Sequence, residues 1–358
     1  DLWAALEKAS GKPVEKLASD WTTQPGFPVL KVEQSCEGGK RKVTLSQQQF
    51  RLDEPARENR LWNVPVQVGT VGGKSYYTLL SGPSTTLTQP GCDAALVVDP
   101  HSVGYFRVQY DTASFDALSG QAARLPDTTR FKLLSDTWSM VLANRLGLAS
   151  YAKLLSGYGD EPRLAVWESI LTNFVTLDRL TQGEPERELV RRYLVKLVTP
   201  KFNKLGWVER PGETMEERQL RTMLAGALAR AGDPAAIAKA RSHFARLQAD
   251  PSSVSPAMID FTVAVTGRYA DAATYEALAK RAQAAQTTED RYRRALTSVL
   301  DPALSARTLE QALSPDLPPQ MSTQIVPGVA RSEHIDQAWA FAVKHRDALM
   351  KNQDAIGR

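Results

Sequence analysis

The spacing of apolar residues changes twice along this chain, and each change predicts a different kind of secondary structure. In the first 20 residues apolar side chains recur every three or four positions, as at Leu2, Leu6 and Ala9, which is the spacing of one helical face. From about residue 30 apolar and polar residues alternate, as they do in half-buried strands, and from about residue 112 the helical spacing returns. We therefore predict a mixed, mainly α fold in which a β-rich segment lies between helices.

The alternating segment predicts a small β-sandwich between about residues 30 and 111. Its apolar runs are short, and glycine pairs such as Gly38-Gly39 and Gly72-Gly73 separate some of them. Short strands divided by turns are typical of sandwiches. The runs lie at residues 30–32, 43–45, 62–68, 76–80, 96–98 and 106–110.

The remainder, residues 112–358, predicts an irregular all-α superhelix of the HEAT/armadillo-like kind. Leu220, Leu224 and Leu228 form one apolar face, and the next helix starts after Asp233-Pro234. Consecutive amphipathic helices with short loops are typical of stacked helical arrays. No strict repeat is present, so we expect the array to be irregular.

The segment before the sandwich, residues 1–29, predicts the terminal helices of a preceding domain. The turn Gln-Pro-Gly-Phe-Pro at residues 24–28 separates these helices from the first strand. Because a helical pattern begins at the first residue, we expect that sequence precedes it and that the chemistry lies there.

Composition narrows the class of protein. The content of 42% hydrophobic and 23% charged residues is typical of a globular protein. The net charge is only +4, with basic residues scattered among acids, which argues against a nucleic-acid partner. No apolar run approaches the ~18 to 20 residues of a membrane span, and the first residues do not resemble a signal peptide.

The two cysteines, Cys36 and Cys92, allow two interpretations. They are either unrelated buried thiols or a disulfide across the sandwich, and a disulfide would indicate an oxidising compartment. The second case predicts a periplasmic or secreted protein, and the first a cytoplasmic one. No Cys-x-x-Cys motif is present, which argues against redox chemistry and a zinc ribbon.

The search for chemistry finds no catalytic or metal-binding set in this chain. His-Glu-x-x-His, Gly-x-Ser-x-Gly and the phosphate-binding loop are all absent from the sequence. Each of the four histidines is predicted to be a surface or loop residue: His101, His243, His334 and His345. Three tryptophans at helical spacing are predicted to be core residues: Trp138, Trp167 and Trp339. Acidic residues at helix starts have a structural explanation, and Thr287 followed by Asp290 resembles a capping box.

Four segments together resemble a known family. They are Asp-Leu-Trp at 1–3 with the following helices to Phe-Pro at 27–28, Val-Gly-Tyr-Phe-Arg-Val-Gln-Tyr at 103–110, Leu-Gly-Trp at 205–207 with Pro-Gly-Glu at 211–213, and Gly-Val-Ala at 328–330 with Ala-Trp at 338–339. Their order and spacing resemble the C-terminal portion of a gluzincin aminopeptidase, in the family of aminopeptidase N and nearest to its puromycin-sensitive branch. The second segment has the two aromatic residues of the family's Gly-Phe-Tyr-Arg strand in swapped order.

The resemblance implies a division of labour within a longer enzyme. In the family, the zinc motif, the Gly-x-Met-Glu-Asn substrate strand and the catalytic Tyr lie upstream of the part that this chain matches, so zinc belongs to the parent enzyme and no cofactor to this chain. The helical domain covers the active site in a chamber that admits peptides, and it usually continues past the position of Arg358. The implied partners are the upstream catalytic domain and peptide substrates.

The resemblance also gives one candidate substrate-binding residue, Arg331. Some relatives place a basic residue of this domain near the carboxylate of the peptide's last residue, and Arg331 follows the matching Gly-Val-Ala. The puromycin-sensitive branch commonly has small residues there. The alternative is a solvated loop arginine.

We therefore expect a non-catalytic C-terminal fragment of a zinc aminopeptidase that encloses the active site and helps to select peptides. The alternative is a freestanding helical-repeat module that binds a protein and has no peptidase activity.

Overall fold

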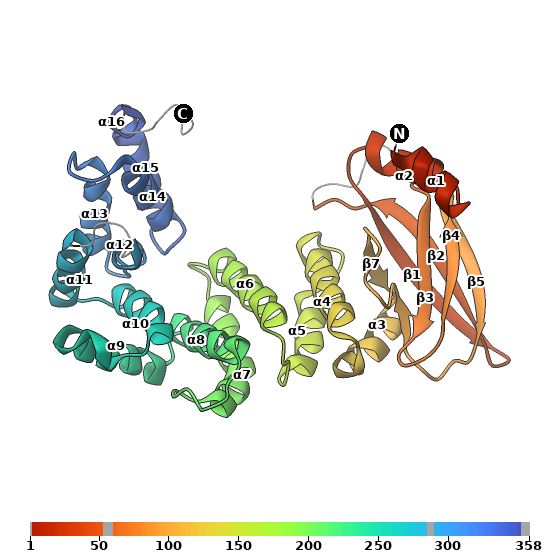
Figure 1. Ribbon diagram of the computed structural model, residues 1–358, viewed down its shortest axis with the longest axis horizontal. Helices are drawn as coiled ribbons and strands as arrows, with labels where there is room; N and C mark the ends of the chain where they lie inside the picture. Colours follow the sequence, from red (N-terminus) through yellow and green to blue (C-terminus); the bar gives the residue numbers. More distant parts are fainter. Residues whose placement is uncertain (1, 53–59, 285–289, 352–358) are drawn as a thin grey trace. The chain divides into compact units, whose positions relative to one another are not determined.

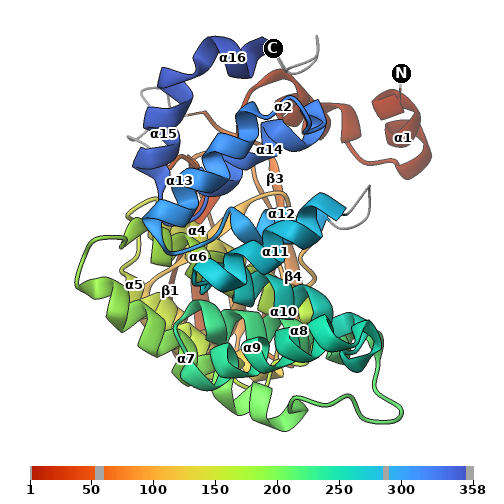
Figure 2. The same ribbon diagram turned by 90° about the vertical axis from the view of Figure 1, so that its left-hand side faces the viewer.

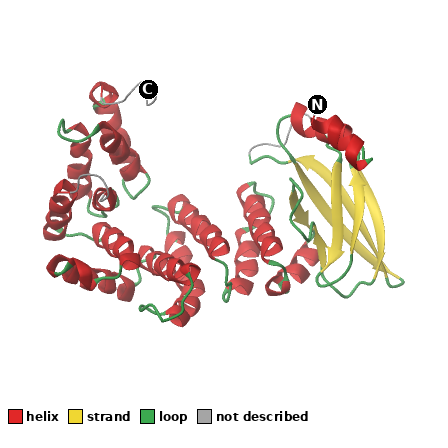
Figure 3. Cartoon of the chain, in the orientation of Figure 1, coloured by secondary structure: helices red, strands yellow, loops and turns green. Residues whose placement is uncertain are grey.

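The computed structural model describes residues 2–52, 60–284 and 290–351. The chain divides into two compact units, residues 1–173 and residues 174–358, and each is described by itself. Every described strand lies between residues 28 and 110, and the described elements after residue 110 are helical (Figure 3). The predicted mixed, mainly α fold is confirmed.

The first unit begins with two short helices, α1 (Leu2–Ser10) and α2 (Val14–Thr23), neither of which contains a buried residue. Hydrogen bonds and a ring contact hold α2 to residues 62–63, just before a strand that begins at Val64. Asp20 Oδ2 accepts from the backbone N and from Nδ2 of Asn63, at 2.8 and 2.7 Å. The rings of Trp21 and Trp62 have their centroids 6.1 Å apart.

Two β-sheets follow (Figure 1). The larger has the order β5-β2-β1-β7, with β7 parallel to β1 and the other pairs antiparallel. Its strands are β1 (Pro28–Glu37), β2 (Lys40–Gln49), β5 (Ser84–Pro90) and β7 (Arg107–Tyr110). The smaller sheet has the antiparallel order β4-β3-β6. Its strands are β3 (Val64–Thr70), β4 (Ser75–Leu80) and β6 (Leu96–Val98).

The core between the sheets follows from the alternation of apolar residues. Val32 lies opposite Leu45 in the β1–β2 register, and both side chains are fully buried. Because successive residues of a strand point to opposite faces, the polar residues next to Val32 and Leu45 along each strand face outward. One buried cluster joins both sheets: Leu30, Val32, Val43, Leu45, Trp62, Val64, Val66, Val68, Leu80, Leu96, Val98, Phe106 and Val108.

Helices complete the first unit: α3 (Thr112–Ser119), α4 (Asp127–Leu142), α5 (Leu148–Leu155) and the first part of α6 (Leu164–Leu180). Asp136 fixes α4 to β7, because it accepts from Arg107 Nη1 at 3.0 Å and from the backbone N of Val108 at 3.1 Å. Lys132, one turn earlier, lies 3.1 Å from the same carboxylate. Burial raises the pKa of Asp136, and these positive neighbours oppose the effect.

The described secondary-structure elements of the second unit are all helices. After α6 it contains α7 (Glu186–Leu205), α8 (Met215–Arg230), α9 (Pro234–Ala249), α10 (Pro256–Arg268), α11 (Ala272–Ala284), α12 (Asp290–Leu296), α13 (Pro302–Glu310), α14 (Pro319–Ala330), α15 (Ile335–Lys344) and α16 (Arg346–Lys351). Helices α8 and α9 both pack on α10, and α14 packs on α15 (Figure 2).

Local sequence sets where these helices start. Asp233 caps α9 by accepting from Ala236 N at 2.8 Å, and Asp301 caps α13 in the same way. In both, a proline takes the first helical position, where no backbone N–H is needed. A full capping box occurs at Thr214 and Glu217 before α8, whereas Thr287 of the predicted box lies outside the described residues.

Two predictions about single residues are wrong. Trp167 and Trp138 are core residues, 0% and 9% exposed, but Trp339 is 71% exposed. The reason is that α15 carries more apolar residues than its buried side holds: Ala338 and Phe341 are buried, whereas Ile335, Trp339 and Val343 are exposed. His243 was expected at the surface or in a loop, but it is 6% exposed within α9.

Candidate functional site

The structure places Arg331 at the C-terminal end of α14, with an exposed side chain. Its Nε donates to the backbone O of Pro327, one turn earlier, at 3.0 Å. The guanidinium therefore folds back along its own helix. The proposed role of Arg331 in binding a peptide's carboxylate stays a prediction.

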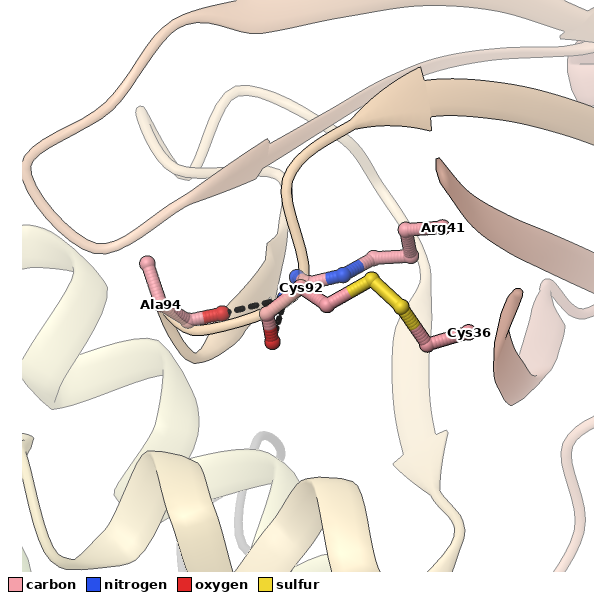
Figure 4. Close-up of a disulfide and its surroundings, with 4 residues drawn as sticks. All are labelled: Cys36, Arg41, Cys92 and Ala94. Atoms are coloured by element: carbon pink, nitrogen blue, oxygen red, sulfur yellow. Dashed lines mark hydrogen bonds between the residues drawn. A yellow bond between two sulfur atoms is a disulfide. The ribbon is translucent and has the colours of Figure 1, made fainter. Parts of the chain in front are cut away.

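Cys36, in β1, and Cys92, just after β5, form a disulfide with a Cα–Cα distance of 6.1 Å (Figure 4). This distance lies within the range of protein disulfides. Buried Arg41 lies beside it, and its Nη2 donates to the backbone O of Cys92 and of Ala94. Burial lowers the pKa of Arg41, while the nearby charge of Asp93 acts in the opposite direction. This end of the sandwich is therefore held by a covalent bond and by an arginine that fixes the loop carrying Cys92.

Metal ligation and membrane insertion were searched over the described residues. Within residues 2–52, 60–284 and 290–351, His, Cys, Asp and Glu side chains form no group of three or more that could hold a metal ion. Over the same residues, no helix combines the length and the apolar character needed to cross a membrane.

Burial lowers the pKa of His243, and the charges of Lys239 and Arg246 lower it further.

The second unit contains a group of charged side chains that we call the arginine–carboxylate cluster. Its members come from four helices and from the turn between α14 and α15. They are Asp178 (α6), Arg187 and Arg191 (α7), Arg230 (α8), Arg268 (α10) and Glu333 (the turn).

Arg187 lies at the centre of this cluster. Its Nε and Nη2 each donate to a different oxygen of Asp178 at 2.9 Å. Its Nη1 and Nη2 donate to the two oxygens of Glu333 at 2.8 and 3.0 Å. Arg191 Nε donates to Asp178 at 2.7 Å, and Arg268 Nη2 donates to Glu333. Such bidentate pairs fix the relative positions of the groups that they join.

Both carboxylates of the cluster are ionised at neutral pH. Burial by itself would raise the pKa of Asp178, but hydrogen bonds from Arg187 and Arg191 lower it to about 2. Burial acts in the same direction on Glu333, and hydrogen bonds from Arg187 and Arg268 lower its pKa to about 2. The two groups therefore contribute two full negative charges.

Arg230 is held less directly. Its Nη2 lies 3.8 Å from Asp178 Oδ2, which is too far for a hydrogen bond. Burial lowers the pKa of Arg230, and the positive charge of Arg268 lowers it further. With four guanidinium groups against two carboxylates, the cluster carries two positive charges in excess. Because guanidinium groups do not release protons near neutral pH, the cluster is suited to holding negative charge rather than to acid–base catalysis.

Local sequence patterns do not predict this cluster, because Asp178 and Glu333 are separated by more than 150 positions. One local signal exists. Arg187 and Arg191 lie one turn apart on α7, and like charges at that spacing are unfavourable by themselves. Such a pair indicates acidic groups on another element that face it.

The architecture defines the class: a helix-rich chain with a small β-sandwich near its N-terminus. Residues 96–356 match the ERAP1-like C-terminal domain family. The chain therefore belongs to this family.

Similarity to named proteins gives the same result. The chain is 30% identical over 281 residues to the puromycin-sensitive aminopeptidase of Caenorhabditis elegans, which covers 75% of this chain and 29% of that protein. It is 28% identical over 369 residues to aminopeptidase M1-A of Oryza sativa subsp. japonica, covering 98% and 41%, respectively. It is 26% identical over 279 residues to aminopeptidase N of Lactococcus lactis subsp. lactis, covering 74% and 32%. The chain thus matches less than half the length of each relative and resembles the C-terminal portion of aminopeptidases, so the alternative of a freestanding helical module is not favoured.

Proposed function

We propose that this chain is the non-catalytic C-terminal portion of a zinc-dependent aminopeptidase that removes N-terminal residues from peptides. The observation that carries the proposal is the family match over residues 96–356. The aminopeptidase names of relatives that are more than twice as long support it. Zinc and the reacting groups would be supplied by the preceding part of the parent enzyme, where zinc activates water for attack on the scissile carbonyl.

The role of the chain itself would be to enclose the active site and to help select peptides. The resemblance to aminopeptidases, whose helical domain covers the catalytic centre, supports this role. Helix α1 supports contact with a preceding domain, since it contains no buried residue and exposes Leu2, Trp3 and Leu6 by 64, 37 and 43%. Apolar side chains grouped in this way are typical of surfaces that pack against another part of a protein.

We also propose that the protein works in an oxidising compartment, the periplasm or the extracellular space. The disulfide geometry of Cys36 and Cys92 supports this location. Alkylation of the purified protein under denaturing conditions, with and without reductant, tests it by mass. Two thiols that react without reductant would remove the case for such a compartment.

The test of the proposed function compares this chain with a polypeptide that also contains the preceding several hundred residues of its reading frame. We expect the longer protein to contain His-Glu-x-x-His, to bind one zinc and to hydrolyse both aminoacyl-anilides and peptides. We expect the chain alone neither to bind zinc stoichiometrically nor to hydrolyse these substrates. Stoichiometric zinc in the chain alone, together with anilide hydrolysis, would refute the proposal.

A role in peptide selection has a separate readout. In the longer protein, Arg331→Gln is expected to raise KM for peptides with a free terminal carboxylate and to leave KM for their amides unchanged. A matched control is Arg307→Gln, because Arg307 is also an exposed helical arginine and pairs with exposed Glu276. Equal KM changes for acids and amides would contradict a carboxylate contact at Arg331.

A further inference from the structure

The arginine–carboxylate cluster has more positive charge than its own contacts use. Four guanidinium groups face two ionised carboxylates. Arg230 shows the imbalance, because the charges that shift its pKa are the cations Arg268 and Arg187 together with the anions Asp178 and Glu333. A buried excess of positive charge is costly unless another negative group balances it.

The unused hydrogen-bond donors lie in the same place. Arg268 is 6% exposed, and only its Nη2 reaches Glu333. Its Nε and Nη1 are buried and have no hydrogen-bond partner among the described residues, and the same holds for Arg230 Nε. Leaving a buried donor unpaired is unfavourable, and more so when the donor belongs to a charged group.

Other buried arginines of the chain show that an unpaired donor by itself does not indicate a ligand. Arg221 has one unpaired nitrogen, but it pairs with buried Glu213 and donates to two backbone oxygens. Arg41 also has one unpaired nitrogen, but it is a single cation that donates to backbone oxygens and has the charge of Asp93 nearby. Only in the arginine–carboxylate cluster, among the described residues, do unpaired N–H groups on two arginines coincide with an excess of positive charge.

The chemistry of these groups restricts the ligand. Guanidinium N–H groups form planar, paired hydrogen bonds that match the oxygens of a carboxylate or phosphate group. A neutral ligand or water could accept these hydrogen bonds but would leave the excess charge unbalanced. These two requirements together favour a small anion that presents paired oxygen atoms.

We propose that the arginine–carboxylate cluster is a binding site for one oxyanion, a carboxylate or phosphate-type group, held by Arg230 and Arg268. The anion could be a free ion or the terminal carboxylate of a peptide, since both present the same oxygens. Access is from the side of Arg191 and Arg230, whose side chains are 24 and 29% exposed, whereas Asp178 and Arg268 are each 7% exposed. The site lies wholly within the second unit, so the proposal does not depend on the peptidase function.

The experiment measures thermal unfolding and calorimetric binding of the full chain with inorganic phosphate and with acetate, at an ionic strength held constant by sodium chloride. We expect a saturable rise in Tm with at least one of these ions, because a ligand that binds only the folded state stabilises it by mass action. Arg230→Gln is expected to weaken that binding about tenfold or more, as for loss of a charge-assisted hydrogen bond. Arg307→Gln, which removes an exposed arginine that pairs with Glu276, should leave it unchanged.

A second arm separates the two sources of the anion. A hexapeptide with a free C-terminus that binds more tightly than its amide, and loses this preference in Arg230→Gln, identifies a peptide carboxylate. Binding of phosphate or acetate with no difference between acid and amide peptides identifies a free ion. A Tm that does not rise with phosphate or acetate at this constant ionic strength, or phosphate and acetate binding that is equal in Arg230→Gln and the parent sequence, would overturn the proposal. Arg268→Gln serves as a second variant only if its circular dichroism spectrum matches that of the parent.

Discussion

Replacing Glu333 by Gln perturbs the arginine–carboxylate cluster with the smallest change in shape. The carboxylate accepts two hydrogen bonds from Arg187, at 2.8 and 3.0 Å, and one from Arg268. The amide keeps one acceptor oxygen and presents an NH₂ group where the second oxygen was. Arg268, which is 6% exposed, then loses the one carboxylate with which it pairs among the described residues.

Two estimates of the loss agree. Removing one partner of a buried ion pair costs about 3 to 5 kcal/mol, because the other charge is left uncompensated. The same hydrogen bonds lower the pKa of Glu333 from 4.5 to about 2, and at about 1.4 kcal/mol per pKa unit this lowering is of the same order, about 3 kcal/mol. We therefore expect Glu333→Gln to lower the free energy of unfolding of the second unit by about 3 to 5 kcal/mol.

The assay is urea-induced unfolding of the full chain, followed by hydrogen exchange and mass spectrometry so that the two units are read separately. Faster exchange is expected in peptides from α7, α8 and α10 and not in peptides from the strands. The control is Glu276→Gln, since Glu276 and Arg307 form a pair at 2.7 Å whose side chains are 59 and 53% exposed. An exposed pair of this kind contributes less than about 1 kcal/mol.

A double variant tests the reason for the loss. If the cost of Glu333→Gln comes from the uncompensated charge of Arg268, then Arg268→Gln added to Glu333→Gln should cost less than the sum of the two single changes. A loss in Glu333→Gln no larger than that in Glu276→Gln would show that the buried ion pairs of Glu333 do not stabilise the second unit. Strict additivity of the two cluster changes would refute the charge argument in particular.

Three further outcomes are expected. Replacing Cys36 and Cys92 by Ser should lower the unfolding free energy by about 2 to 4 kcal/mol, because the bond closes a loop with a sequence separation of 56. As a check, adding a reductant should lower the unfolding free energy of the parent protein by the same amount and should not change that of the Ser variant. Asp178 and Glu333 have folded pKa values of about 2, below their unfolded values of about 4. The stability that they supply is therefore complete above about pH 4 and is lost as pH falls from about 4 to 2. An unfolding free energy that does not change over that interval would contradict this prediction. Trp339→Gln should change the free energy of unfolding of the chain by no more than about 0.5 kcal/mol, because the indole is 71% exposed; a loss above about 2 kcal/mol in urea unfolding would show that the indole is packed.

The strands that could be predicted are those with an alternating apolar pattern. The run at residues 96–98 coincides with β6, and the run at 76–80 lies within β4. Strand β5 (Ser84–Pro90) was not predicted, because its sequence, Ser-Thr-Thr-Leu-Thr-Gln-Pro, offers one large apolar residue. It forms by pairing with β2 at the edge of the larger sheet. Pairing of this kind depends on a partner that the local sequence does not contain.

The same limit explains what could be predicted of the charged site. Asp233 and Asp301 act on helices that begin at the next residue, so the spacing alone indicates their capping role. The arginine–carboxylate cluster instead joins helices that approach only after folding, and its members have no common spacing. Trp339 shows a related limit, since α15 has apolar residues both on its buried side and on its exposed side, and helical spacing does not show which of them are buried.

The excess charge of the arginine–carboxylate cluster predicts different responses to phosphate in two variants, and these responses distinguish an anion-binding role from a purely structural one. If the cluster only supports the fold, Arg230→Gln and Glu333→Gln have no reason to affect anion binding in opposite directions. If it holds an oxyanion, Arg230→Gln removes a ligand, whereas Glu333→Gln raises the excess from two positive charges to three and frees donors of Arg268 and Arg187. Phosphate should then stabilise the Glu333→Gln protein more than the parent protein, and the Arg230→Gln protein less. Thermal unfolding of the three proteins across a phosphate series at constant ionic strength measures this order, and the same phosphate response in all three would leave the cluster a purely structural role.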